Sequence, residues 1–363
     1  MTSIVDRIPP AWQVRTVRAL YSLPPSARRL LAGKPVTVNG QRLDPDTQLM
    51  LKLSNAQGNR LTGPTPAEAR VRLEQGSALA GGPPDPSVST RDVRIPGPAG
   101  TIDARLYTPD GLAEGSGLVV YYHGGGWVIG SIASHDSACR FLAAQGGVRV
   151  LAPNYRLAPE HPFPAAVDDS VATFRYAVAH ARELGADAGL VAVSGDSAGG
   201  NLAAVVCHVT AAEGTERPAF ALLFYPAADA STRRPSRDTY GDGYFLTDGD
   251  MDWFRDHYAP DPAQHSDPRL SVLLSGHLAG FPPTYLTVGG FDPLLDEVVA
   301  LGDALAGAGV PVVTRVQPDL IHGFASFLGM LPRAREATAE AVGALRTGLA
   351  VAAVRGAETA VKD

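Results

Sequence analysis

The sequence predicts an α/β fold in which a mostly parallel, eight-stranded sheet is flanked by helices and carries a helical cap. From about residue 86 onward, short apolar runs alternate with helical stretches, which is typical of a parallel sheet with helices on both sides. The runs at 118–122 and 190–194 are apolar, as expected for strands that are covered on both faces. Before residue 86 the chain shows only short amphipathic helical stretches.

Eight short runs rich in apolar residues are expected to form the sheet. They are 91–96, 102–108, 117–122, 148–153, 190–194, 219–224, 284–288 and 312–316. The main helices are expected between and after these strands, at 134–145, 165–183, 198–213, 294–308 and 331–350.

Composition divides the chain into three segments. Segment 1–85 holds amphipathic helices and ends in the proline- and glycine-rich linker 81–87. These helices are expected at 11–21, 26–33, 45–57 and 66–76. The main domain is expected to comprise 86–228 and 263–363. Between its halves, 229–262 is polar, turn-rich and studded with aromatic residues, so we expect a loop that joins the N-terminal helices as a cap over the site.

Composition also limits the class of protein. The 363 residues carry a formal net charge of -6, which gives no electrostatic footprint for nucleic acid. The two cysteines, Cys139 and Cys207, cannot form a disulfide framework and are expected to be buried thiols. No run approaches the roughly 18–20 apolar residues that span a bilayer, and prolines interrupt the N-terminal stretch. We therefore expect a cytoplasmic protein without an integral membrane segment.

The sharpest chemical signal is the sequence Gly-Asp-Ser-Ala-Gly-Gly at 195–200. It follows the apolar run 190–194 and continues into an alanine-rich helical stretch. Between a strand and a helix, Gly-x-Ser-x-Gly holds the serine in a strained turn with its hydroxyl projecting from the edge of the sheet. This context favours a nucleophile at Ser197 over a serine that only caps a helix.

The second signal is His-Gly-Gly-Gly-Trp at 123–127, directly after an expected strand. Successive glycines leave backbone N–H groups free to point at one oxygen, as the tetrahedral intermediate of acyl transfer requires. We expect the N–H groups of Gly124, Gly125 and Ala198 to form such an oxyanion hole. His123 precedes these donors and is expected to be structural.

A serine nucleophile needs a general base, and the base needs an orienting carboxylate. Of the nine histidines, His322 lies in the loop after the last expected strand, at the sheet edge where Ser197 also emerges. Asp292 lies in the corresponding loop after 284–288. Pro293 follows Asp292, so a structural role as a helix N-cap stays open for this aspartate. The sequence thus predicts a catalytic triad of Ser197, His322 and Asp292.

Five motifs in this order resemble those of the hormone-sensitive-lipase-like carboxylesterases (bacterial family IV) of the α/β-hydrolase superfamily. They are His-Gly-Gly-Gly-Trp at 123–127, Asn-Tyr-Arg-Leu-Ala-Pro-Glu at 154–160, Gly-Asp-Ser-Ala-Gly-Gly-Asn at 195–201, Asp-Pro-Leu-Leu-Asp-Glu at 292–297 and His-Gly-Phe at 322–324. The segment 40–51 is similar to the cap region of actinobacterial members. The resemblance covers the chain from about residue 40 to its end.

The resemblance implies an α/β-hydrolase fold whose cap combines the N-terminal helices with an insertion after the sixth strand. It also implies hydrolysis of short- to medium-chain acyl esters, small-molecule substrates, without a cofactor or metal. No cluster of residues with metal-ligand spacing is visible in the sequence. Relatives of this kind are often dimers through the last strand and helix, so a homodimer is one assembly to expect.

Side chains near the mouth of the site are expected to bind an apolar acyl or alcohol group. They are Trp127, Asp196, Tyr225, Tyr244, Phe245, Met251 and Phe254. Packing of the aromatic residues into the core stays open as an alternative.

Three other functions would use the same fold. An amidase, lactonase or specific deacetylase shares every catalytic residue, and only rates on matched ester and amide substrates separate these activities. A true lipase is disfavoured because no long apolar lid is visible. A non-catalytic receptor is also disfavoured: the plant gibberellin receptors, which resemble this family, lack the catalytic histidine, whereas His322 is present here.

Overall fold

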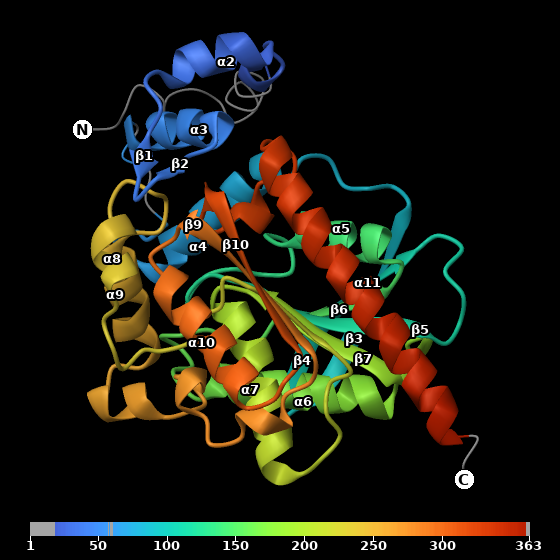
Figure 1. Cartoon of the computed structure of the whole chain (residues 1–363). Helices are drawn as coiled ribbons and strands as arrows, with labels where there is room; N and C mark the ends of the chain where they lie inside the picture. Colours follow the sequence, from blue (N-terminus) through green and yellow to red (C-terminus); the bar gives the residue numbers. More distant parts are fainter. Residues whose placement is uncertain (1–18, 57, 59–60, 361–363) are drawn as a thin grey trace.

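The computed structural model describes residues 19–56, 58 and 61–360, and its centre is a twisted eight-stranded sheet (Figure 1). The strands are β3 (Val88–Gly97), β4 (Gly100–Pro109), β5 (Ser116–Tyr122), β6 (Arg149–Pro153), β7 (Ala186–Asp196), β8 (Ala221–Phe224), β9 (Thr284–Phe291) and β10 (Val312–Ile321). Their order in the sheet is β10-β9-β8-β7-β5-β6-β4-β3. Strands β5 to β10 run parallel, whereas β4 pairs antiparallel with both β6 and β3. The predicted fold class, a mostly parallel sheet flanked by helices, is confirmed.

Helices cover both faces of this sheet (Figure 1). They are α5 (Asp136–Gly146), α6 (Ala165–Ala179), α7 (Ala198–Glu213), α10 (Leu295–Gly307) and α11 (Pro332–Ala360). Helices α5 and α11 pack together on one face, and α6 packs beside α7 on the other. Their apolar residues and the interior strands form one continuous core, so β5, for example, is buried from Gly117 to Tyr122.

The N-terminal helices lie at one end of the molecule, near the helices of the insertion (Figure 1). The N-terminal elements are α2 (Pro25–Ala32), the strand pair β1 (Thr37–Val38) and β2 (Gln41–Arg42), α3 (Pro45–Ala56) and α4 (Pro66–Ala80). Hydrogen bonds join the two parts. Asn55 Nδ2 donates to the Gly243 carbonyl (3.0 Å), and the Thr62 hydroxyl (2.5 Å) and N–H (3.4 Å) both donate to Asp250 Oδ1. The predicted helix at 11–21 lies outside the described residues except for its last three.

The insertion corrects one expectation, because 229–262 contains two helices where the sequence predicts a loop. These are α8 (Pro235–Tyr240) and α9 (Asp248–Tyr258). The polar residues that suggested a loop instead stabilise the start of α9. Thr247 and Asp250 form a reciprocal capping box, and Asp248 pairs with Arg237. Short 3₁₀ turns follow at Pro262–Ser266, Val272–Leu274 and Leu278–Gly280, and another lies at Phe324–Ser326.

The carboxyl ends of the parallel strands gather the residues on which the chemistry depends. His123 follows β5, Ser197 follows β7, Asp292 follows β9 and His322 follows β10. Strands β5 and β7 are neighbours, which brings the glycine-rich loop beside the serine. Ligands of open α/β sheets bind at this edge, so the topology alone places a site here.

Helix α11 is the one described helix that is long and apolar enough to cross a membrane, over Pro332–Gly356, by length and composition. Its residues Ala337, Ala341 and Leu345 are fully buried against the core. One face of α11 packs on the core as far as Leu349, and about a third of the apolar window is buried (33%).

Two glycines in helices give opposite predictions for substitution by alanine. A Cβ on Gly199, at the start of α7, would overlap the Tyr122 carbonyl oxygen and lie 2.5 Å from that of His123. Gly199→Ala should therefore lower the free energy of unfolding by about 1–3 kcal/mol or more. Gly343→Ala in α11 should raise it by up to about 1 kcal/mol, because no described atom lies within 4 Å of its Cβ position. Urea unfolding measures both, and an equal effect of the two substitutions would contradict the packing described.

Candidate active site

Ser197 lies in the sharp turn between β7 and α7. Its backbone has φ 54° and ψ −118°, a conformation that is strained for a residue with a side chain. A Cβ on Gly195 would overlap the Gly199 carbonyl, so glycine is required for the two ends of the turn to approach this closely. The Ser197 N–H donates to the Phe224 carbonyl (2.9 Å), which fixes the turn to β8. The serine hydroxyl is thereby held at the edge of the sheet, where it lines a cavity.

The structure brings Ser197, His322 and Asp292 together from three separate loops. His322 Nε2 lies 3.0 Å from Ser197 Oγ, and His322 Nδ1 lies 2.9 Å from Asp292 Oδ2. The carboxylate of Asp292 is an acceptor, so Nδ1 carries a proton and donates it to Asp292. In the neutral imidazole, Nε2 is then free to accept the hydroxyl proton of the serine.

The carboxylate of Asp292 is itself fixed in place. Its side chain is completely buried, and its Oδ1 accepts the Leu294 N–H at 2.8 Å. The Tyr225 ring packs beside the His322 imidazole, with ring centroids 4.7 Å apart. The tyrosine hydroxyl accepts the Ala325 N–H (3.2 Å), which anchors the loop that carries the histidine. Both the orientation of the base and that of its carboxylate are set by packing and hydrogen bonds.

The glycine-rich loop corrects the predicted oxyanion hole at one position. The Gly124 N–H donates to Asp196 Oδ1 at 2.9 Å, so it is not free to bind a substrate oxygen. Gly124 also does not line the cavity, whereas Gly125 and Gly126 do. Within the described part of the chain, no acceptor takes the N–H of Gly125, Gly126 or Ala198. The N–H groups that remain available are those of Gly125 and Ala198, both in the predicted set, and that of Gly126, which takes the place of Gly124.

Asp196, predicted to bind substrate, joins the serine turn to the glycine-rich loop. Its carboxylate is 4% exposed and accepts the Tyr121 hydroxyl (2.8 Å) as well as the Gly124 N–H. Burial opposes ionisation, but the nearby His135 and the hydrogen bonds from His135 and Tyr121 outweigh it and lower the pKa of Asp196. Asp196 lines the cavity, and its Oδ1 is occupied by protein donors.

His123 is buried behind the same loop, as its place in the motif predicts. Burial, and secondly the neighbouring His135, lower its pKa to about 3, so its ring is neutral at physiological pH. Its Nδ1 lies 2.8 Å from the Gly124 carbonyl, and its own carbonyl accepts the Tyr155 hydroxyl at 2.7 Å. These contacts are those of a structural residue.

The cavity wall also contains a second serine–histidine pair. Ser134 Oγ lies 2.8 Å from His135 Nδ1, and His135 Nε2 lies 3.4 Å from Asp196 Oδ1. Ser134 Oγ also accepts the Ser131 N–H and bonds to the Ser131 carbonyl, both at 2.9 Å. This hydroxyl both accepts and donates within a local turn, whereas the Ser197 hydroxyl bonds to His322 directly before the free Ala198 N–H, so the geometry favours Ser197 as the nucleophile.

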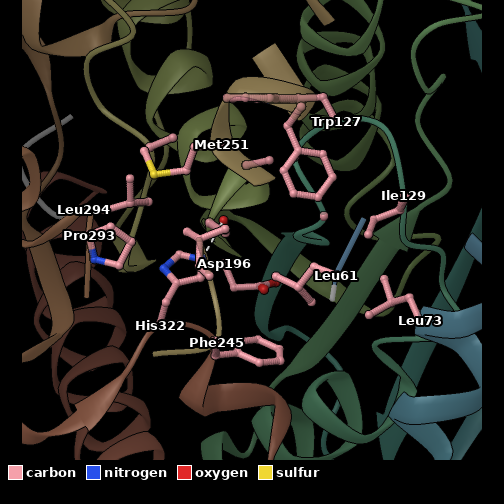
Figure 2. Close-up of a pocket in the computed structure, with 18 of the residues that line it drawn as sticks. Leu61, Leu73, Trp127, Ile129, Asp196, Phe245, Met251, Pro293, Leu294 and His322 are labelled. Atoms are coloured by element: carbon pink, nitrogen blue, oxygen red, sulfur yellow. Dashed lines mark hydrogen bonds between the residues drawn. The ribbon is translucent and has the colours of Figure 1, made fainter. Parts of the chain in front are cut away.

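A cavity of about 1320 Å³ opens over Ser197 and His322 (Figure 2). Of the predicted substrate-binding residues, five line it. They are Trp127, Asp196, Phe245, Met251 and Phe254. In Figure 2, Leu61, Leu73 and Ile129 lie on one side of the catalytic residues, and Met251 and Leu294 lie on the other. Apolar side chains thus line the cavity on both sides of His322.

Two predicted substrate-binding residues lie outside this cavity. Tyr225 is fully buried beneath His322 and supports the base. Tyr244 packs against Phe291, with ring centroids 5.4 Å apart. For these two tyrosines the alternative of packing within the protein is correct. Both tyrosines lie near catalytic loops in the sequence, but this position does not show whether the ring points into the cavity or into the core.

The sequence predicts that the N-terminal segment belongs to the cap, but it did not identify which side chains of this segment line the cavity. They include Met50, Leu73 and Leu79 of the helices and Leu61 between α3 and α4. Leucine at helical spacing is the ordinary signature of a core-facing helix, so the sequence carries no signal that marks these side chains as part of a binding site.

Glu297 is a buried carboxyl at the cavity wall. One of its oxygens accepts the Ala228 N–H at 2.8 Å. Burial above all, with added repulsion from Asp229 and Asp292, raises the pKa of Glu297 from 4.5 to about 8. At neutral pH the carboxyl is therefore protonated. It holds the loop after β8 without placing a second negative charge near Asp292. Among the described residues there is no group of three or more His, Cys, Asp or Glu side chains that could hold a metal ion.

Comparison with known proteins agrees with this geometry. The family described as the alpha/beta hydrolase fold matches residues 119–326. The chain is 41% identical over 344 residues to the carboxylic ester hydrolase LipN of Mycobacterium tuberculosis, covering 92% of this chain and 90% of that protein. It is 40% identical to an ethyl acetate hydrolase of Pseudomonas putida, covering 78% and 90%. Ester-hydrolase EH1AB1 from the metagenome of Lake Arreo, solved with a bipyridine phosphonate derivative, superposes with a TM-score of 0.81 at 40% identity and covers 84% of this chain and 98% of that one.

The protonated Glu297 predicts a pH dependence of stability. The folded protein raises the pKa of the Glu297 carboxyl. Its contribution to the free energy of unfolding is therefore fully present below about pH 4.5 and declines as the pH rises to about 8. Glu297→Gln keeps an acceptor for the Ala228 N–H but cannot ionise. Between pH 5 and 9 the Tm of the wild type should therefore fall by several degrees more than that of the variant. Parallel Tm curves would show that Glu297 is ionised in the folded protein.

Proposed function

We propose that this chain, which belongs to the α/β-hydrolase family and to its hormone-sensitive-lipase-like branch, is a serine carboxylesterase acting on short- to medium-chain acyl esters. The observation that carries the proposal is the hydrogen-bonded series Ser197–His322–Asp292 beside three free N–H groups. Relatives named carboxylic ester hydrolase and ethyl acetate hydrolase support the reaction class.

In the first half of the reaction, Ser197 Oγ attacks the ester carbonyl carbon as His322 Nε2 removes the hydroxyl proton. Asp292 holds the imidazole in the reactive tautomer and stabilises the imidazolium that forms. The carbonyl oxygen gains a negative charge, which the N–H groups of Gly125, Gly126 and Ala198 stabilise. Loss of one such donor typically lowers turnover by ~10²–10³-fold.

Collapse of the tetrahedral intermediate breaks the bond to the alcohol, and His322 returns its proton to the leaving oxygen. The acyl group remains on Ser197 as an ester. Water then attacks this acyl-enzyme by the same route, with His322 again as the base, and releases the carboxylic acid and free Ser197.

The cavity supports an apolar substrate of modest size. Its wall near the serine contains aromatic and aliphatic side chains from both the N-terminal helices and α9. Such walls bind apolar groups, while the few polar groups at the centre orient the ester. We also propose that the protein acts in the cytoplasm, which the buried free thiols of Cys139 and Cys207 support. A homodimer through β10 and α11 stays a prediction.

The proposed nucleophile is tested by hydrolysis of p-nitrophenyl esters from acetate to dodecanoate. The wild type should prefer chains of two to eight carbons, and Ser197→Ala should lower kcat by about 10⁴-fold or more, because no other group can form the acyl-enzyme. Parallel assays on matched amides separate an esterase from an amidase.

Ser194→Ala is the matched control. This serine lies three residues earlier in β7, and its buried hydroxyl has no hydrogen-bond partner among the described residues, so the variant should keep the wild-type rate. A wild type that is inert on every ester, or a Ser197→Ala variant that keeps its activity, would overturn the proposal.

A further inference from the structure

We infer that α9 of the insertion sets the position of the oxyanion hole, with Phe254 and Tyr258 as positioning residues for Gly126 and Trp127. The inference rests on the proposed function and adds a role that the insertion would have besides covering the substrate. Phe254 and Tyr258 are four residues apart on one helix, so they lie on the same face and can hold two successive residues of the loop.

Phe254 packs directly on Gly126. A Cβ on Gly126 would overlap the ring carbons of Phe254, so the aromatic ring lies against the loop backbone with no space between them. Phe254 is 6% exposed, and Gly126 has φ 57°, a left-handed conformation that leaves its N–H without an acceptor in the described part of the chain. The ring therefore packs against one of the three proposed donors.

Tyr258 secures the next residue of the loop. Its ring stacks on the Trp127 indole, with centroids 4.6 Å apart and planes 8° from parallel. Trp127 has φ 60°, which is unfavourable for a bulky residue and persists only where the surroundings impose it. Phe163 packs edge-on against the other side of Tyr258 and donates its N–H to the Tyr258 carbonyl at 2.8 Å. The stack thus ties the loop to the C-terminal end of α9.

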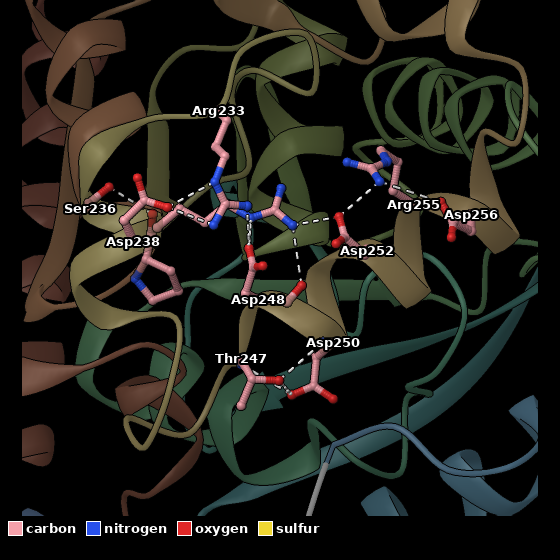
Figure 3. A network of polar contacts seen from close by, with 11 residues as sticks. Arg233, Ser236, Asp238, Thr247, Asp248, Asp250, Asp252, Arg255 and Asp256 are labelled. Atoms are coloured by element: carbon pink, nitrogen blue, oxygen red, sulfur yellow. Dashed lines mark hydrogen bonds and ion pairs between the residues drawn. The ribbon is translucent and has the colours of Figure 1, made fainter.

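Helix α9 is itself anchored by several polar contacts (Figure 3). Its first turn is closed by the capping box of Thr247 and Asp250. Arg237 pairs with Asp248 and, at 2.6 Å, with Asp252, which fastens α9 to α8. Asp250 also accepts the Thr62 hydroxyl, so the N-terminal segment contacts the same turn.

The two ends of the glycine-rich loop are thereby held by different parts of the protein. The serine turn holds Gly124 through Asp196, whereas α9 holds Gly126 and Trp127. The Gly125 N–H lies between these anchors, and the Gly126 N–H lies at the second anchor. An error of about 1 Å in such a position can lower the rate about 100-fold, so removal of the support should affect the transition state more than substrate binding.

The test is Phe254→Ala, assayed for kcat and KM and for inhibition by a matched pair of ligands. Ser197 Oγ adds to the carbonyl carbon of a trifluoromethyl ketone, and the ketone oxygen becomes an oxyanion. The corresponding secondary alcohol has no carbonyl and cannot form this adduct. We expect kcat to fall by about ten- to a hundredfold with KM within about threefold. The Ki of the ketone should rise by the same factor as kcat falls, and the Ki of the alcohol should stay within about threefold.

Two further variants make the result decisive. Met251→Ala removes a cavity-lining side chain one turn earlier on α9, so it should shift KM and weaken both ligands equally. Phe254→Leu keeps apolar volume against Gly126 and should restore part of kcat. If Phe254→Ala does not fold, the same assays are made on Phe254→Leu instead.

If the Phe254 variants bind the ketone and the alcohol more weakly by the same factor and keep the wild-type kcat, Phe254 only lines the cavity. That result would overturn the inference. If the wild type hydrolyses no ester, the proposed function itself is wrong.

Discussion

The hydrogen bond from the Gly124 N–H to Asp196 is the contact on which the active site depends most. It joins the loop after β5 to the turn after β7, the two segments that must supply the oxyanion donors and the nucleophile. Because Asp196 directly precedes Ser197, a displacement of the glycine-rich loop would also displace the serine. The neutral, buried His123 and the Tyr121 hydroxyl complete the packing behind this contact. Gly125 is therefore the first residue of the glycine-rich loop whose N–H is free to bind a substrate oxygen.

The parallel sheet and the cap divide the remaining tasks between them. The sheet brings Ser197, Asp292 and His322 to one edge, where they need only short loops to meet. The N-terminal helices and the insertion close a cavity of about 1320 Å³ over that edge. In our account the insertion has a second task, since α9 holds the far end of the glycine-rich loop. Chemistry and substrate enclosure would then share one structural element.

The sequence predicted the sheet, the main helices and the residues that meet as Ser197–His322–Asp292, because apolar periodicity and chain order carry that information. It included Gly124 in place of Gly126 among the oxyanion donors, since nothing in three successive glycines tells which N–H a neighbouring carboxylate accepts. It took 229–262 for a loop because α9 is polar, short and stabilised by a capping box and by distant ion pairs. It also assigned Tyr225 and Tyr244 to the cavity, because ring direction depends on tertiary packing. Leu61 and Leu73, conversely, were indistinguishable from core residues.

The central claim, that Ser197 is activated by His322, is tested most directly by covalent labelling. The protein is treated with a p-nitrophenyl alkylphosphonate, whose phosphonyl group is transferred to an activated serine as p-nitrophenolate leaves. The modified peptide is then located by mass spectrometry. The account predicts one adduct per chain, at Ser197, with labelling lost in His322→Ala. An adduct at Ser134, beside His135, or labelling that persists without His322, would contradict it.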